Sequence, residues 1–174
     1  MATDETITNR VAGSGLVTLN LEEHFPANQI VELDLKELLV GGLMLREKDL
    51  REFVRTRDWG AFQDKVIAVY CSTDAIIPTW AYMLIAIAAQ PYAARVVFGN
   101  LETALVSCFK DKLDAINWSQ YQDAKVVVKG CSDVAIPAAV YLDVAARLRG
   151  VASSIMYGEP CSTVPLFKRQ KSGA

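Results

Sequence analysis

The sequence predicts an α/β fold: a mostly parallel sheet built from two duplicated β-α-β units, with an N-terminal β/α portion packed on it. Two observations carry this prediction. "DWGAFQD" at 58–64 recurs as "NWSQYQD" at 117–123, an offset of 59 residues (117 − 58). After each of these segments comes a short β-branched run, then an apolar segment led by proline, then a second short strand. This order is typical of parallel βαβ units.

The first copy begins with "VIAVY", a continuous apolar run at 66–70 that is typical of a buried parallel strand. Pro78 suits the first turn of a helix, where its missing N–H costs nothing, and the helix is expected to end near Gln90. A short strand follows at 95–98 and ends at Gly99. The segment 101–117 then predicts an amphipathic helix that links the copies.

The second copy repeats this order. "KVVVK" at 125–129 predicts a strand, 137–149 a helix, and 154–157 a second strand that ends at glycine. Asp143 and Arg147 are spaced to form an i,i+4 ion pair on a solvated helix face. The two Cys-Ser pairs lie 60 rather than 59 apart (131 − 71), so we place one extra residue in the second copy's strand and one in the first copy's loop, which restores the offset of 59.

The N-terminal portion differs in character. "GLVTLNL" at 15–21 and "QIVELDL" at 29–35 alternate like half-buried strands. Gly41–Gly42 indicates a turn, and 45–59 predicts a surface helix whose inward side carries Leu50, Phe53 and Val54. Without a linker, we expect one domain over 1–174, made of 1–57, 58–116 and 117–174.

Composition excludes several classes of function. A net charge of −2 and a pI near 5.4 argue against binding to nucleic acid or to an anionic membrane. The apolar run 75–94 holds prolines that limit it to a short core helix, so we expect no membrane span. The start "MATDETITNR" does not resemble a signal peptide, so we expect a cytoplasmic protein whose cysteines are reduced. The short basic stretch near the C-terminus is expected to be a solvated tail.

Two cysteines are expected at one site. If both copies contribute to one doubly wound sheet, Cys71 and Cys131 lie at neighbouring carboxyl ends, where such sheets bind ligands. Aligning "GNLE" with "GEPC" then places Glu102 at the position of Cys161. Cys71, Glu102, Cys131 and Cys161 together suit tetrahedral zinc or iron(II). No nucleotide cofactor is expected, because "AGSG" at 12–15 lacks a preceding strand and a third glycine.

Two alternatives stay open. The cysteines could fill tight turns in a non-catalytic interaction domain, as we expect for Cys108 on an apolar helix face. Cys71 or Cys131 could instead be the nucleophile of a thiol enzyme acting on a small substrate, with a lowered pKa near a helix N-terminus. Its partners would come from the single histidine and the nearby loop carboxylates: His24, Asp74 and Glu159.

A homodimer is expected. The helix at 79–89, "TWAYMLIAIAA", is apolar around its whole circumference, whereas its counterpart carries Asp143 and Arg147. Monomers rarely expose such a face, and twofold dimers commonly bury one. Trp80 has no repeated counterpart and is expected to face a pocket or a subunit contact. In the alternative, the N-terminal portion of the same chain covers this helix.

Several segments resemble a bacterial family called domain of unknown function 2480: "REKDLREF", "CSTDAIIPTWAYM", "FGNLETAL", "VVKGCS" and "SIMYGEPCSTVPLFKR". The resemblance covers nearly the whole chain, and "MYGEPCSTVPL" is its most specific part. It implies no established activity. Members of the family are associated with genes for iron–sulfur cluster assembly, so the resemblance implies a role as an accessory factor in metal or iron–sulfur handling.

Overall fold

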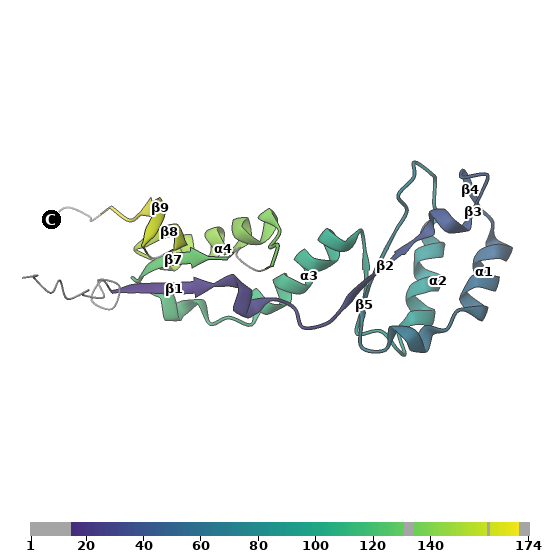
Figure 1. Cartoon of the computed structure of the whole chain (residues 1–174), viewed down its shortest axis with the longest axis horizontal. Helices are drawn as coiled ribbons and strands as arrows, with labels where there is room; N and C mark the ends of the chain where they lie inside the picture. The colour runs from purple at the N-terminus through teal and green to yellow at the C-terminus, as the bar shows by residue number, and fades with distance from the viewer. Residues whose placement is uncertain (1–14, 131–133, 160, 171–174) are drawn as a thin grey trace, which may run out of the picture. The chain divides into compact units, whose positions relative to one another are not determined.

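The computed structural model of the chain describes residues 15–130, 134–159 and 161–170. The chain divides into two compact units, each with a sheet of its own (Figure 1). The central unit comprises Pro26–Asp111. The terminal unit joins the segment up to Phe25 to the segment from Lys112 onward, so the boundary falls inside helix α3 (Leu101–Asp114).

The central unit has a three-stranded parallel sheet in the order β2-β5-β6. The middle strand, β5 (Val66–Tyr70), lies between β2 (Ile30–Asp34) and β6 (Arg95–Phe98). Its pattern of consecutive apolar residues is explained by this position, because a central parallel strand is buried on both faces. The remaining elements of this unit before β5 are η2 (Leu35–Leu38), β3 (Leu39–Val40), β4 (Met44–Leu45), α1 (Glu47–Thr56) and η3 (Trp59–Phe62).

Helices cover both faces of this sheet. Ile67 and Val69 of β5 belong to a cluster with the apolar sides of α1 and α2 (Thr79–Ala89). Val66 and Ala68 point to the opposite face and pack against Ala104 and Cys108 of α3. The prediction that Leu50, Phe53 and Val54 of α1 point inward is confirmed, because all three belong to the cluster between α1, α2 and β5. The predicted turn at Gly41–Gly42 is also confirmed, with positive φ values of 61° and 72°.

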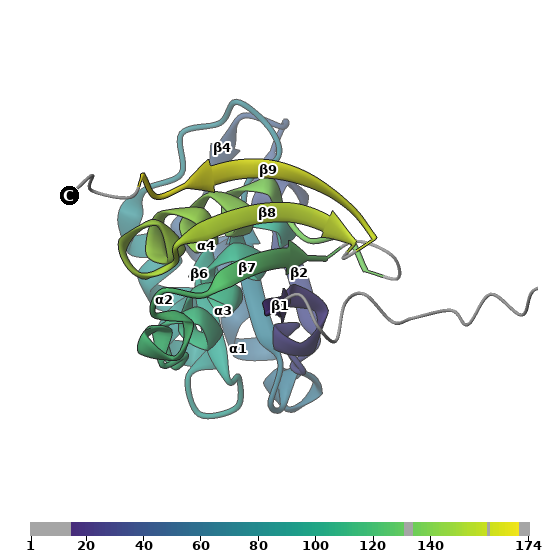
Figure 2. The ribbon, with the colours of Figure 1, turned by 90° about the vertical axis from the view of Figure 1, so that its left-hand side faces the viewer.

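The terminal unit has a four-stranded sheet in the order β1-β7-β8-β9, which Figure 2 shows from one side. β1 (Leu16–Asn20), β7 (Lys125–Lys129) and β8 (Ser154–Glu159) are parallel, and β9 (Ser162–Lys168) returns antiparallel to β8. Helix α4 (Ala138–Val151) connects β7 to β8 and buries one line of apolar side chains: Val140, Val144 and Leu148. The 3-10 helices of this unit are η1 (Leu21–His24) and η4 (Trp118–Tyr121).

The same local geometry occurs at corresponding places in the two units. The indole N–H groups of Trp59 and Trp118 each donate at 2.9 Å to the carbonyl five residues earlier. Asp64 and Asp123 both have positive φ, 59° and 57°. β5 and β7 are each five residues long and 59 positions apart (125 − 66), so the extra residue follows the second strand rather than lying within it.

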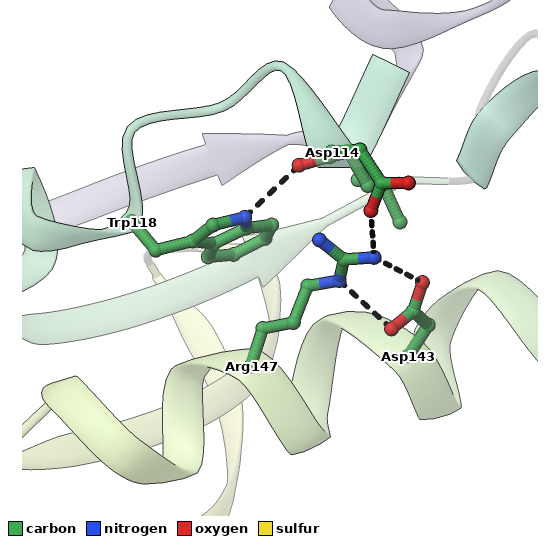
Figure 3. A network of polar contacts seen from close by, with 5 residues as sticks. Asp114, Trp118, Asp143 and Arg147 are labelled. Atoms are coloured by element: carbon green, nitrogen blue, oxygen red, sulfur yellow. Dashed lines mark hydrogen bonds and ion pairs between the residues drawn. The ribbon is translucent and has the colours of Figure 1, made fainter. Parts of the chain in front are cut away.

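Arg147 of α4 ties the terminal unit together (Figure 3). Its Nε lies 2.8 Å from Oδ1 of Asp143, which confirms the expected i,i+4 pair. Its Nη2 also donates to Asp114, a carboxylate that the helical spacing could not indicate. The guanidinium carbon lies 5.5 Å from the centre of the Trp118 ring. The two carboxylates raise the pKa of Arg147, chiefly through hydrogen bonds, so it stays charged.

The mixed α/β class and the parallel strands are confirmed, but the prediction of one sheet is corrected. β5 is flanked by β2 and β6, whereas β7 is flanked by β1 and β8. Both hydrogen-bonding edges of β5 and of β7 are therefore paired with other strands, and β5 and β7 cannot be neighbours. The N-terminal strands are not packed on a shared sheet; each is an edge strand of a different sheet.

The C-terminal segment is a second correction. The expected strand at 154–157 runs on to Glu159, and a strand that was not predicted, β9, follows and includes Lys168, the first residue of the basic stretch expected to be a solvated tail. Arg169 then forms an ion pair with Asp123 and donates to the carbonyls of Val151 and Ala152. No helix within the described part of the chain combines the length and the apolar character that crossing a bilayer requires.

Candidate functional site

Cys71 follows β5 directly, at the carboxyl edge of the central sheet. It is a half-buried free thiol that packs against the cluster shared by α1 and α2. Its Sγ lies 3.3 Å from Oγ1 of Thr73, within hydrogen-bonding distance. Burial raises the pKa of the nearby Tyr82 hydroxyl, and the charge of Cys71 raises it further. The thiol therefore lies beside a phenol that stays protonated.

The loop that carries Cys71 is fixed by Asp34, the last residue of β2. Oδ1 of Asp34 accepts hydrogen bonds from the backbone N–H of Ser72 and of Lys36, each at 3.0 Å. Nζ of Lys36 lies 3.4 Å from the other carboxylate oxygen. Burial alone would raise the pKa of Asp34, but the hydrogen bonds from Ser72 and Lys36 together lower it. An ionised Asp34 thus holds the start of the loop.

The N-terminus of α3 lies after β6 at the same edge. Oε1 of Glu32 accepts from the backbone N–H of Leu101 at 3.0 Å, and Oδ1 of Asn100 accepts from that of Thr103 at 3.1 Å. These contacts satisfy two of the N–H groups that a helix start leaves open. Glu102 lies in the first turn with an exposed side chain. A carboxylate there is favoured by the helix dipole and is free to accept a ligand.

The carboxyl edge of the terminal sheet has a different set of polar groups. Nζ of Lys129, the last residue of β7, lies 3.2 Å from Oε2 of Glu159, the last residue of β8. The Tyr141 hydroxyl donates at 2.8 Å to the carbonyl of Gly130, which is buried. Cys161 is an exposed free thiol in the turn between β8 and β9. This edge therefore carries a lysine–carboxylate ion pair on the neighbouring strands β7 and β8, and a thiol in the turn after β8.

The four residues predicted as metal ligands fall into two pairs. Cys71 and Glu102 belong to the central unit, where they follow the neighbouring strands β5 and β6. Cys161 belongs to the terminal unit and follows β8; Cys131 lies outside the described residues, and the sequence places it directly after Gly130. Within the residues that the structure describes, no three His, Cys, Asp or Glu side chains are grouped so that they could hold a metal ion.

The reasoning that linked these residues needs correction at two points. β5 and β7 are not neighbours, so Cys71 and Cys131 do not follow adjacent strands. Glu102 and Cys161 also have different surroundings, because the chain enters α3 after Gly99 but continues into β9 after Gly158. The two positions align in the sequence because each follows a glycine. Both places favour glycine because the backbone there has a positive φ, 127° at Gly99 and 118° at Gly158.

The other candidate residues are placed as follows. Cys108 is buried against β5, as expected for a packing residue, and burial raises the pKa of its thiol. His24 ends η1 in the terminal unit, and Asp74 is exposed in the loop that carries Cys71. Among the described residues, therefore, no histidine lies in the loop that carries Cys71 or elsewhere in the central unit.

Sequence reasoning missed the carboxylates and amides that shape these edges, above all Asp34, Glu32 and Asn100. A signal for Asp34 was present. Asn20 and Asp34 each end a strand before a Leu-led 3-10 helix, and each accepts a hydrogen bond from the backbone N–H two residues later. Such Asx residues at a strand end indicate a fixed turn rather than a solvated one.

Fold and edges together define a mixed α/β protein in which the free thiols of Cys71 and Cys161 lie beside the carboxyl ends of parallel strands. The chain belongs to the family described as "Protein of unknown function (DUF2480)", whose family model matches residues 5–169. The resemblance noted in the sequence is thereby confirmed. No curated protein and no solved structure matches the chain.

Proposed function

We propose that this protein binds a transition metal, zinc or iron(II), through cysteines at the carboxyl ends of its parallel strands. The proposed ligands are Cys131 and Cys161 in the terminal unit and, as a separate pair, Cys71 and Glu102 in the central unit. One observation carries the proposal: Lys129 and Glu159 end the paired strands β7 and β8, and a cysteine comes two residues after each of them in the sequence. Neighbouring strands are only about 4.8 Å apart, so two thiolates that follow them can share one ion.

The cysteines of this chain divide into two kinds. Cys71 and Cys161 are half-buried and exposed free thiols after strand ends, whereas Cys108 is buried in α3 against β5. Thiolates are the ligands that zinc and iron prefer at such sites, and a carboxylate such as Glu102 is a weaker additional ligand. A cytoplasmic accessory factor in metal or iron–sulfur handling would need this kind of site, because it must both accept and release its ion.

We further propose that the two β-α-β segments arose by duplication. The support is that strand, helix and second strand recur at an offset of 59: β5 and β7, α2 and α4, β6 and β8 begin 59 residues apart. On this proposal the two halves diverged after their second strands. One retained a helix at that point, and the other acquired β9 and Cys161.

The experiment is elemental analysis of the protein purified without added metal. We expect stoichiometric zinc or iron in the wild type, and loss of most of it in Cys131→Ser and in Cys161→Ser. Cys108→Ala is the matched control, because it removes a thiol from the same chain but from a packed helix face. Equal metal content in all variants, or metal-free wild type, would contradict the proposal.

A thiol enzyme is the second candidate, and the surroundings of Cys71 favour it. The Thr73 hydroxyl at 3.3 Å can donate to a Cys71 thiolate and stabilise it. In this case metal-free protein should contain one thiol that reacts with iodoacetamide far faster than the others, and Thr73→Val should slow that reaction. If neither metal nor a fast thiol is found, a non-catalytic interaction domain is the function that remains.

A further inference from the structure

Helix α2 has three sides with different surroundings. Ala81, Ile85 and Ala89 are fully buried toward the central sheet. Leu84 and Ala88 pack on the cluster that contains the inward side of α1, so the N-terminal portion does cover part of this helix. The third side stays open.

That open side is a stripe of large apolar residues. Trp80, Met83 and Ile87 are 37%, 60% and 70% exposed, and their spacing places them along one side of the helix. Together with Leu84 they line a shallow groove of about 320 Å³. Trp80 therefore faces a groove, one of the two surroundings expected for it. A groove that presents three large apolar side chains to water is typical of a contact surface.

The corresponding side of α4 differs. Positions 59 residues later hold Ala139, Leu142 and Ala146, so only Leu142 is large; it is 73% exposed. Asp143 and Arg147 lie on the same helix and pair with each other. The bulky apolar stripe is therefore a property of α2 and not of this type of helix in general. Leu142 supplies a control residue of similar exposure in similar backbone geometry.

The rim of the groove carries charges of both signs. Glu47 and Arg51 of α1 line it and form an ion pair at 2.8 Å. The adjoining surface of α1 continues the alternation with Lys48, and with Glu52 and Arg55, which pair at 2.6 Å. A surface for nucleic acid or an anionic membrane would carry one sign of charge. Alternating signs beside an apolar stripe are self-complementary, as a twofold contact requires.

We propose that a second copy of this chain docks on the groove, with α2 packed against α2 of the partner and the charged residues of α1 forming the rim. The apolar stripe alone is smaller than the roughly 800 Å² per partner that a stable interface buries. The contact must therefore include α1, whose charged residues supply the polar rim usual around an apolar interface core. This inference is independent of the proposed metal site.

The test is sedimentation velocity over a dilution series. We expect the wild type to be dimeric at tens of micromolar. Ile87→Glu should weaken dimerisation by about tenfold or more, because a charge in a desolvated interface is costly. Leu142→Glu makes the same change on the open side of α4 and should leave the dimer intact. Circular dichroism establishes that both variants are folded.

Charge reversal tests the twofold arrangement itself. Arg51→Glu should weaken the dimer because it places two acidic residues at the rim, and adding Glu47→Arg should restore it. A wild type that stays monomeric at tens of micromolar would overturn the proposal. So would equal effects of Ile87→Glu and Leu142→Glu. If the monomer also shields Trp80 from acrylamide quenching, a segment of the same chain covers the groove instead.

Discussion

Gly130 comes directly after β7, at a buried position where a side chain has little room. A Cβ atom there would lie 2.9 Å from Oη of Tyr141, 3.0 Å from Cδ1 of Ile136 and 3.2 Å from Cβ of Leu21. The Tyr141 ring cannot swing away without cost, because its hydroxyl donates to the carbonyl of Gly130 itself at 2.8 Å. Gly130→Ala must therefore either break this hydrogen bond or shift the surrounding apolar side chains.

The size of the effect follows from two opposing contributions. Adding a methyl group to a packed interior costs about 1–3 kcal/mol. Replacing glycine by alanine also restricts the unfolded chain, which offsets about 0.4–1 kcal/mol. We therefore expect Gly130→Ala to lower the free energy of unfolding by about 1–2 kcal/mol. Gly150→Ala is the matched control, because Gly150 lies in α4 and a Cβ there would meet nothing within 4 Å. It should stabilise the protein by about 0.5–1 kcal/mol.

Urea unfolding followed by circular dichroism measures both changes. Tyr141→Phe removes the hydroxyl and should cost about 1 kcal/mol for the lost hydrogen bond. With the hydroxyl gone, Gly130→Ala should cost less than it does in the wild type, so the double variant is more stable than additivity predicts. Strictly additive effects, or a Gly130→Ala protein as stable as the wild type, would refute the packing described at this edge.

Three further predictions concern the two units. Although burial opposes it, hydrogen bonding lowers the pKa of Asp34 below its ordinary value of 3.8. The ionised carboxylate therefore stabilises the fold above that value, and this contribution fades as the pH falls through the lowered pKa. Asp34→Asn should therefore lower the free energy of unfolding relative to the wild type at neutral pH, and this difference should shrink on acidification. A difference that does not change with pH would contradict the stabilising role of the ionised carboxylate. Arg147→Leu should lower the free energy of unfolding by about 1 kcal/mol, and by less in high salt, because both of its carboxylate partners are over a third exposed. Urea unfolding at two ionic strengths measures this change, and an unchanged free energy of unfolding at low salt would contradict it. Asp64→Gly should raise stability by about 0.5 kcal/mol, since glycine adopts the φ of 59° without a Cβ penalty; a lower urea midpoint would contradict it.

Elements with strong local signals could be predicted from the sequence. The inward residues of α1 follow from helical periodicity, and the burial of β5 follows from its run of apolar residues. The turn at Gly41–Gly42 follows from the need for positive φ. In each case the cause lies within a few residues of the chain, so the pattern alone is sufficient.

The partners of the strands could not be predicted in the same way. β1 and β2 have similar alternating patterns, yet one pairs with β7 and the other with β5. Alternation reports which side of a strand is buried but not which strand lies beside it. β9 was missed because Pro165 interrupts it and both Val164 and Leu166 are exposed, so it lacks the pattern of a half-buried strand.

The candidate site was affected by the same limit. Cys71, Glu102 and Cys161 do follow strand ends, as their positions after apolar runs indicated. Their grouping depended on β5 and β7 being neighbours, which the pairing of each strand with its own two partners prevents. The strand pairs that do exist, β5 with β6 and β7 with β8, group the proposed ligands differently.

The central claim is that cysteine thiolates of this chain bind a metal ion. X-ray absorption at the zinc or iron edge of the purified protein tests it most directly, because the technique reports the atoms bound to the ion. The account predicts a shell of sulfur atoms, at about 2.3 Å for zinc, that is depleted in Cys131→Ser and Cys161→Ser but unchanged in Cys108→Ala. A shell of oxygen and nitrogen alone, at about 2.0–2.2 Å, would contradict it.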